Sequence, residues 1–204
     1  MVEQDTSNWR PRSAWTGIVE PGQIGTDGKP GVVATALDDM GFATLIEPAG
    51  LDNLEHAIKR MIGLDLPRRP SVSLSRTHGV AWAGINQWLL IARQREGFAD
   101  LVGALSDHAA VSDQSHGRAA LRVSGPKVRE VLAKGVMVDL HSSLFPVGAT
   151  ARTSIAYIDV QFWRAEDGPD GPIFEILMPR SMAGSFWSWF AASAGEFGCC
   201  VRRD

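Results

Sequence analysis

The chain has 204 residues, of which 45% are hydrophobic and 21% charged, so it can bury one well-filled domain or two small ones that share a core. A net charge of -3 leaves no basic stripe for nucleic acid or an anionic membrane surface, and no apolar run reaches the length of a membrane span. The polar amino-terminal residues show no signal peptide, and Cys199 and Cys200 are adjacent, which excludes a disulfide framework and favours a reducing cytoplasm.

Residues 1–50 are predicted to be an irregular amino-terminal arm, because turn-forming residues interrupt them and their apolar positions show little periodicity. Two short strands are expected within the arm, over residues 32–36 and 43–47. The arm also contains Trp9 and Trp15. These side chains either pack on their own domain or anchor the arm on another subunit, where tryptophan is favoured.

Residues 51–79 are predicted to be a helix followed by a linker. The helix is expected to begin at Asp52, with Glu55 three residues later as in a capping box, and to end near Gly63. The linker leads into the main domain, which is predicted to span residues 80–204.

Six predicted elements within the main domain follow the order strand, helix, strand, strand, helix, strand. Their expected ranges are 87–92, 98–105, 109–114, 118–124, 126–134 and 136–140. Ser124, Gly125 and Pro126 form the turn that opens the second helix, because proline is tolerated at a first helical position. This order is that of a ferredoxin-like βαββαβ sandwich, so the predicted fold class is α+β.

An additional strand, strand, helix unit is predicted after this sandwich. A long half-buried strand is expected from Ala151 to Trp163, its hairpin partner from Ile173 to Met178, and then a helix capped by Ser181. A hairpin over residues 80–92 precedes the first helix of the sandwich in the same way. Two α/β layers that share one sheet system would account for this recurrence.

The polar residues predict little chemistry. The five histidines lie at spacings that put no two on one helical face, so no metal site is predicted. Residues 112–116 contain Ser, Asp and His, but they favour a turn, because the members of a catalytic triad converge from separate segments. The glycines between residues 22 and 31 neither follow a strand nor open a helix, as a dinucleotide site requires. We therefore predict no catalytic, cofactor-binding or metal-binding residue.

Tryptophan is abundant, with seven residues against one tyrosine. Trp187 and Trp189 are predicted to lie on opposite sides of one helix, so one of the two rings should not reach its own core. Exposed apolar groups of this kind typically mark a protein interface. The predicted interface residues are Trp9, Trp15, Trp187 and Trp189, on a soluble cytoplasmic α/β domain that binds another protein.

Several motifs between residues 80 and 201 recur in an order and spacing that resemble one known family. The motifs are Asp113, Ser115 and Arg118; Ser124-Gly125-Pro126; Leu132-Ala133-Lys134-Gly135; Asp139-Leu140; Phe145-Pro146 and Gly148; Thr153; Phe174; Pro179-Arg180-Ser181; and Trp187 with Trp189. In this combination the chain resembles the gamma subunit of heterotetrameric sarcosine oxidase. Such subunits are similar to the first, folate-binding-type domain of glycine-cleavage aminomethyltransferases, which agrees with the ferredoxin-like order.

The resemblance implies a four-subunit complex that oxidises sarcosine to glycine with release of hydrogen peroxide. The other product is formaldehyde, or methylenetetrahydrofolate when tetrahydrofolate is present. FAD, FMN and NAD are implied on the alpha and beta subunits and zinc on the delta subunit, with no cofactor on this chain. The implied partners are the alpha, beta and delta subunits, with alpha in direct contact.

The chain departs from the aminomethyltransferase pattern, because it is too short for the additional domains that close a folate pocket. No position matches a catalytic carboxylate, so the resemblance implies a non-catalytic subunit of an oxidoreductase. The alternative is a free-standing folate-dependent protein of the aminomethyltransferase type. A third option, a chaperone-like folate protein for iron-sulfur assembly, is disfavoured because its cysteine motif is absent.

Overall fold

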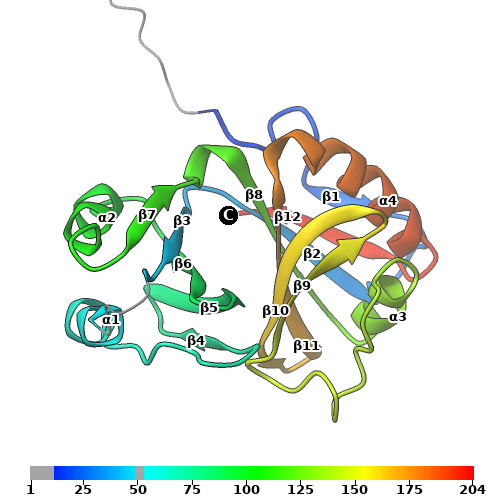
Figure 1. The fold of residues 1–204 in the computed structure, drawn as a ribbon. Helices are drawn as coiled ribbons and strands as arrows, with labels where there is room; N and C mark the ends of the chain where they lie inside the picture. The colour runs from blue at the N-terminus through cyan, green and yellow to red at the C-terminus, as the bar shows by residue number, and fades with distance from the viewer. Residues whose placement is uncertain (1–11, 49–52) are drawn as a thin grey trace, which may run out of the picture.

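The structure is a computed structural model that describes residues 12–48 and 53–204. Two β-sheets pack against each other in the centre, and helices cover the outer face of each sheet (Figure 1). The four layers confirm the predicted α+β class. None of the helices in the described ranges is long and apolar enough to cross a membrane.

The larger sheet has seven strands, and its central strands come from distant parts of the sequence. In spatial order they are β1 (Gly22–Ile24), β12 (Cys199–Arg203), β2 (Val32–Leu37), β8 (Arg118–Ser124), β11 (Gly171–Pro179), β10 (Ile158–Gly168) and β9 (Thr150–Ile155). β12 and β2 pair in parallel, whereas the other neighbours are antiparallel. The two outermost strands are β1 and β9.

The smaller sheet has five antiparallel strands. In spatial order they are β4 (Val72–Leu74), β5 (His78–Gly84), β6 (Gln87–Ala92), β3 (Gly41–Ile46) and β7 (Ala110–Asp113). β2 and β3 are consecutive in sequence, so the chain passes from one sheet to the other between Leu37 and Gly41.

Two helices pack on each sheet. α1 (Leu54–Ile62) and α2 (Phe98–Leu105) share an apolar cluster with the five-stranded sheet. α3 (Val128–Ala133) and α4 (Ala183–Gly195) share one with the seven-stranded sheet. Short 3-10 helices occur at Ser115–Gly117 and Arg180–Met182.

A third apolar cluster lies between the two sheets. It joins Leu37 and Trp163 of the seven-stranded sheet to Phe42, Leu89 and Ile91 of the five-stranded sheet. Because strand side chains alternate between two faces, each central strand contributes to this cluster on one side and to a helix-covered cluster on the other.

Several predicted elements match the structure. β6, α2 and β8 have the bounds expected from their apolar periodicity, and β11 pairs with β10 as the predicted hairpin partner. The recurrence of strand, strand and helix corresponds to β5, β6 and α2 in one sheet layer and to β10, β11 and α4 in the other.

The ferredoxin-like arrangement is not confirmed. The strands that were expected to share one sheet are divided, with β6 and β7 in the five-stranded sheet and β8 in the seven-stranded sheet. Residues 136–140 form no strand, and Val136 makes only an isolated bridge to Ile155. The apolar run around Met137 suggested a buried strand, but the Met137 side chain is 75% exposed.

The expected strand from Ala151 to Trp163 is instead a tight hairpin. β9 and β10 pair Ile155 with Ile158, and Ala156 and Tyr157 form the turn with φ values of 50° and 65°. Two central residues at positive φ are typical of a two-residue hairpin, where Asn and Gly are preferred. Neither Asn nor Gly is present here, and the alternation of apolar and polar residues continues through the turn. The sequence pattern therefore contained no sign of the hairpin.

The two short strands expected within the arm are present as β2 (Val32–Leu37) and β3 (Gly41–Ile46), although they were not expected to belong to the main sheets. β2 pairs with β8 and β12, and β3 pairs with β6 and β7, so both strands lie inside the sheets. Their apolar alternation is short but regular, and the pairing partners follow much later in the sequence. β12 was not predicted, because Arg202 and Arg203 resemble a solvated tail.

Candidate functional site

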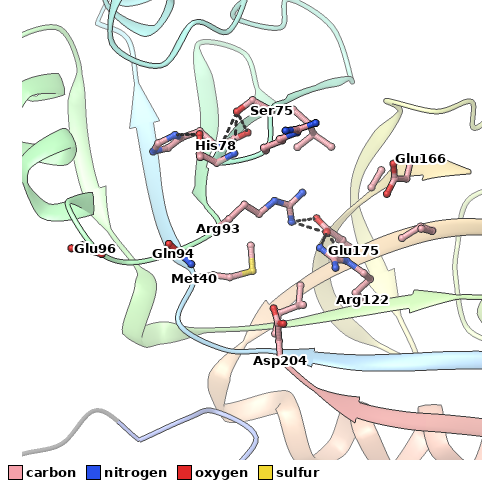
Figure 2. A pocket seen from close by; sticks show the side chains of 16 residues that line it. Met40, Ser75, His78, Arg93, Gln94, Glu96, Arg122, Glu166, Glu175 and Asp204 are labelled. Atoms are coloured by element: carbon pink, nitrogen blue, oxygen red, sulfur yellow. Dashed lines mark hydrogen bonds and ion pairs between the residues drawn. The ribbon is translucent and has the colours of Figure 1, made fainter. Parts of the chain in front are cut away.

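A cavity of about 900 Å³ lies where the two sheets face each other (Figure 2). The five-stranded sheet and its loops contribute Ser75, His78 and Arg93, and the seven-stranded sheet contributes Arg122 and Glu175. Further polar residues and a group of apolar side chains also line the cavity. The polar ones are Arg76, Thr77, Gln94, Glu96, Glu166 and Asp204. The apolar ones are Leu37, Met40, Leu74, Ala165 and Ile173.

Glu175 is the buried acid of this cavity, with 1% of the residue exposed. It lies on β11, where Phe174 and Ile176 belong to the cluster under α4. Strand alternation therefore directs Glu175 to the opposite face, toward the five-stranded sheet. A buried carboxylate is tolerated only when its oxygens are paired.

Three side chains satisfy the Glu175 carboxylate. Arg93 Nη1 donates to Oε1 at 2.6 Å and to Oε2 at 2.8 Å. Arg122 donates to Oε1 from Nε at 3.0 Å and from Nη2 at 2.8 Å. Trp163 Nε1 donates to Oε2 at 2.9 Å. The carboxylate is thus engaged from β8, β10 and the residue after β6, as Figure 2 shows for the two arginines.

His78 lies at the edge of the cavity in a local hydrogen-bonded turn. Its backbone N–H donates to Ser75 Oγ at 3.0 Å, and that hydroxyl donates to the His78 carbonyl at 3.1 Å. Partial burial lowers the pKa of His78, because desolvation disfavours the charged imidazolium. The Ser75 hydroxyl is therefore a turn-stabilising group, whose hydrogen bonds within the described ranges go to backbone groups of Thr77 and His78.

This cavity was not predicted from the sequence. Arg93, Arg122 and Glu175 come together from elements that are far apart in the sequence. One available signal was Glu175 itself, a charged residue inside the apolar run Ile173–Met178. Such a residue on a central strand needs a cationic partner when buried.

The predicted turn at residues 112–116 is confirmed. Asp113 Oδ1 accepts from Ser115 Oγ at 2.6 Å and from the Ser115 backbone N–H at 2.8 Å. The imidazole of His116 lies 3.2 Å from Arg95 Nη1, and no hydrogen bond joins it to Ser115. These residues hold the start of β8 against β3 and form no triad. Within residues 12–48 and 53–204, no three His, Cys, Asp or Glu side chains gather as metal ligands.

The structure contradicts the predicted docking role of Trp15. Its ring is fully buried in the cluster under the seven-stranded sheet, and Nε1 donates to the Ala120 carbonyl at 3.0 Å. Its indole therefore packs on its own domain and is not presented to a partner. Trp9 lies outside the described residues.

Trp187 and Trp189 are both half-buried, so the expectation that one ring would miss the core is wrong. Both pack on Phe190, with ring centroids 5.9 Å and 6.5 Å from it. Trp189 also lies against Gly135, where an added Cβ would come within 2.5 Å of its Cζ2. The reason is that residues 134–136 fold over α4 and give the second ring a surface to pack on.

Exposed apolar side chains flank this contact. Met137 is 75% exposed and Tyr157 is 100% exposed. The Ala156 N–H donates to the Gly135 carbonyl at 3.0 Å, which brings the β9–β10 turn beside the segment after α3. We call Met137, Tyr157 and the partly exposed Trp189 the hairpin surface.

The comparison with a family model matches residues 48–196 to the sarcosine oxidase gamma subunit family. The chain is 37% identical over 146 residues to sarcosine oxidase subunit gamma of Corynebacterium sp. (strain P-1), covering 69% of this chain and 70% of that one. For the corresponding protein of Arthrobacter sp., the identity is 32% over 137 residues, covering 64% and 68%.

Solved structures agree with this match. Heterotetrameric sarcosine oxidase from Corynebacterium sp. U-96, in complex with pyrrole 2-carboxylate, contains a chain with a TM-score of 0.76 and 26% identity, covering 91% of this chain and 95% of that one. The glycine cleavage system aminomethyltransferase T from Bartonella henselae shares the fold, with a TM-score of 0.60 at 14% identity, covering 85% and 48%. The family match spans most of the sequence, and the chain therefore belongs to the sarcosine oxidase gamma subunit family.

Proposed function

We propose that this chain is a non-catalytic gamma subunit of a heterotetrameric sarcosine oxidase. The complex would oxidise sarcosine to glycine and hydrogen peroxide, with formaldehyde or methylenetetrahydrofolate as the other product. The observation that supports this most directly is the similarity to a chain of heterotetrameric sarcosine oxidase over 91% of the present sequence. The shared fold of the aminomethyltransferase does not transfer its activity.

A structural role agrees with the geometry of the cavity. The Glu175 carboxylate accepts hydrogen bonds from three side chains, which leaves it a structural ion-pair partner and not a free general base. We therefore place the chemistry on the partners, with FAD, FMN and NAD on the alpha and beta subunits and zinc on delta. An absorbance spectrum of the purified chain with bound flavin would contradict this division.

We place the contact with the alpha subunit at the hairpin surface. Fully exposed apolar groups cost solubility unless they are covered, and aromatic residues and methionine are enriched at the centres of interfaces. Trp189 gives this surface a rigid base, because its ring is held between Gly135 and the neighbouring phenylalanines of α4.

The test is co-expression with affinity-tagged alpha, beta and delta subunits. The double variant Met137→Glu, Tyr157→Glu should reduce recovery of the gamma chain by about tenfold, because two charges would be buried in the interface. Ile85→Glu is the matched control, since Ile85 is 90% exposed on the β5–β6 turn of the other sheet. It should assemble like the wild type.

The outcomes distinguish an error in the proposed subunit role from an error in the proposed contact surface. If the wild-type chain does not co-purify with the other subunits, the subunit role is wrong. If the wild type assembles and the double variant assembles equally well, the role holds and the hairpin surface is not the contact. Loss of sarcosine oxidation when the gamma chain is omitted, with flavin content retained on the partners, is the expected result for a non-catalytic subunit.

A further inference from the structure

We propose that the cavity between the two sheets binds a small monocarboxylate with an apolar body, through the guanidinium groups of Arg93 and Arg122. This site is independent of the docking role assigned to the hairpin surface. Three features of the cavity support it: N–H donors that Glu175 leaves unused, the charge balance at the inner end, and the apolar side chains in part of the wall.

Glu175 fixes the two arginines next to each other. Arg93 Nη1 and Arg122 Nη2 hold the same oxygen, Oε1, at 2.6 Å and 2.8 Å. The guanidinium groups are planar and rigid, so anchoring one edge also sets the direction of the others. The buried carboxylate thus acts as a positioning group for two neighbouring cations.

Donors remain on both guanidinium groups. Among the described residues, Arg93 uses only Nη1, and Arg122 uses Nε and Nη2. Within residues 12–48 and 53–204, the Nε and Nη2 of Arg93 and the Nη1 of Arg122 have no hydrogen-bond acceptor, and none of these three atoms is fully buried. These N–H groups are therefore open to the cavity, where a carboxylate could accept from them.

The local charge favours one added anion. Two guanidinium groups and one carboxylate leave a net charge of about +1 at the inner end of the cavity. The outer wall contains the exposed carboxylates of Glu96, Glu166 and Asp204, against a single exposed guanidinium from Arg76. A polyphosphate would meet these acids, whereas a single carboxylate at the inner end would lie beside the cations.

Part of the cavity wall is apolar and fits an apolar body of the ligand. Leu37, Met40, Leu74 and Ile173 line the same cavity, and the volume of about 900 Å³ lies within the range of small-molecule sites. In such sites the apolar side chains contact the body of the ligand, and the polar groups set its orientation. The ligand class is therefore a monocarboxylate with an apolar or aromatic portion.

The experiment titrates the ¹⁵N-labelled full chain with benzoate and follows the indole N–H resonance of Trp163, identified by its loss in Trp163→Phe. This group donates to Glu175, so binding at the arginines should shift its resonance. Benzamide is the neutral control with the same ring. Arg122→Gln removes one cation while Arg93 and Trp163 still hold Glu175, and Arg152→Gln removes the same charge from exposed β9, outside the cavity.

We expect the wild type to bind benzoate saturably with a millimolar or tighter Kd. Benzamide should bind the wild type at least about tenfold more weakly, and the Arg122→Gln variant should bind benzoate at least about tenfold more weakly. The Arg152→Gln variant should bind like the wild type. Equal shifts with benzamide, unchanged affinity in Arg122→Gln, or no saturation by about 20 mM benzoate would each overturn the proposal. If Arg122→Gln does not fold, the comparison of benzoate with benzamide on the wild type still decides it.

Discussion

Arg93 and Glu175 form an ion pair that joins the two sheets, with 2.6 Å between Nη1 and Oε1. Arg93 follows the last residue of β6 in the five-stranded sheet, and Glu175 lies in β11 of the seven-stranded sheet. The apolar cluster that contains Trp163 lies beside them. The pair therefore fixes the two sheets against each other where the apolar contact between them ends and the cavity begins.

Glu175→Gln should lower the free energy of unfolding by about 2 to 4 kcal/mol, because Arg93 and Arg122 lose their shared counterion in a partly buried setting. Asp159→Asn is the matched control, since Asp159 makes an exposed pair with Arg152 at 3.8 Å. It should change stability by less than about 0.5 kcal/mol. Urea denaturation measures both, and equal midpoints for the two variants would show that the buried pair is not needed.

Gly125→Ala should destabilise the chain by about 1 to 3 kcal/mol. Gly125 has a φ of 116°, and an added Cβ would come within 2.5 Å of the Gly31 carbonyl oxygen. Gly103 in α2 is the control, because nothing lies within 4 Å of its added Cβ. Gly103→Ala should stabilise by about 0.5 to 1 kcal/mol, as in an ordinary helix interior. A loss of stability in both variants would point to a general effect of the substitution.

Trp15→Ala should cost about 3 to 5 kcal/mol, because the fully buried ring leaves a cavity and the Ala120 carbonyl loses a donor. Trp187→Ala removes the same side chain from a half-buried position and should cost less. Thermal unfolding of the two purified variants gives the comparison. A Trp15→Ala variant that melts with the wild type but fails to assemble would restore Trp15 as a docking residue.

Stability should fall as the pH is lowered from about 7 to about 5, with part of the loss due to His78. Desolvation lowers the pKa of His78 in the folded state, so the unfolded chain binds a proton more readily. The contribution is complete above the ordinary pKa of about 6.5 and is lost as the pH falls through the folded value. The pH dependence of unfolding should be shallower in His78→Asn, and an identical slope would exclude His78 as a contributor.

Alkylation should distinguish the two cysteines. Burial raises the pKa of Cys199 to about 11, and its side chain is inaccessible, whereas Cys200 is partly exposed. Since the thiolate is the reactive form, iodoacetamide should modify Cys200 first in the native chain. Peptide mass spectrometry reads out the order, with unfolded chain as the control in which both react. Faster modification of Cys199 would mean that β12 opens readily.

The sequence predicted elements whose signals are local. β6, β8 and α2 have clear apolar periodicity and bounded ends, and they occur where expected. The turn at Ala156 and Tyr157 was missed because neither residue is a usual turn former, although both have positive φ. The division into two sheets could not be predicted, since it depends on which strands pair and not on the pattern within each strand.

The cavity could not be predicted from local sequence patterns for the same reason. The strand that contains Arg122 was predicted, but the partner Glu175 follows after two further strands and a helix. Arg93 comes from the other sheet altogether. For Trp189, helical spacing predicts the side of α4 on which the ring lies. It does not predict the loop at Gly135 that covers the ring.

The parallel pairing of β12 with β2 has a consequence for folding. β12 inserts between β1 and β2, and it pairs Cys199 with Val32 across nearly the whole sequence. Until β12 arrives, β1 has no neighbour in the sheet and β2 presents an open edge. Contacts between residues far apart in the sequence form slowly during folding, and an open strand edge can pair with another chain. Newly made chains should therefore be prone to aggregate until their last strand is in place.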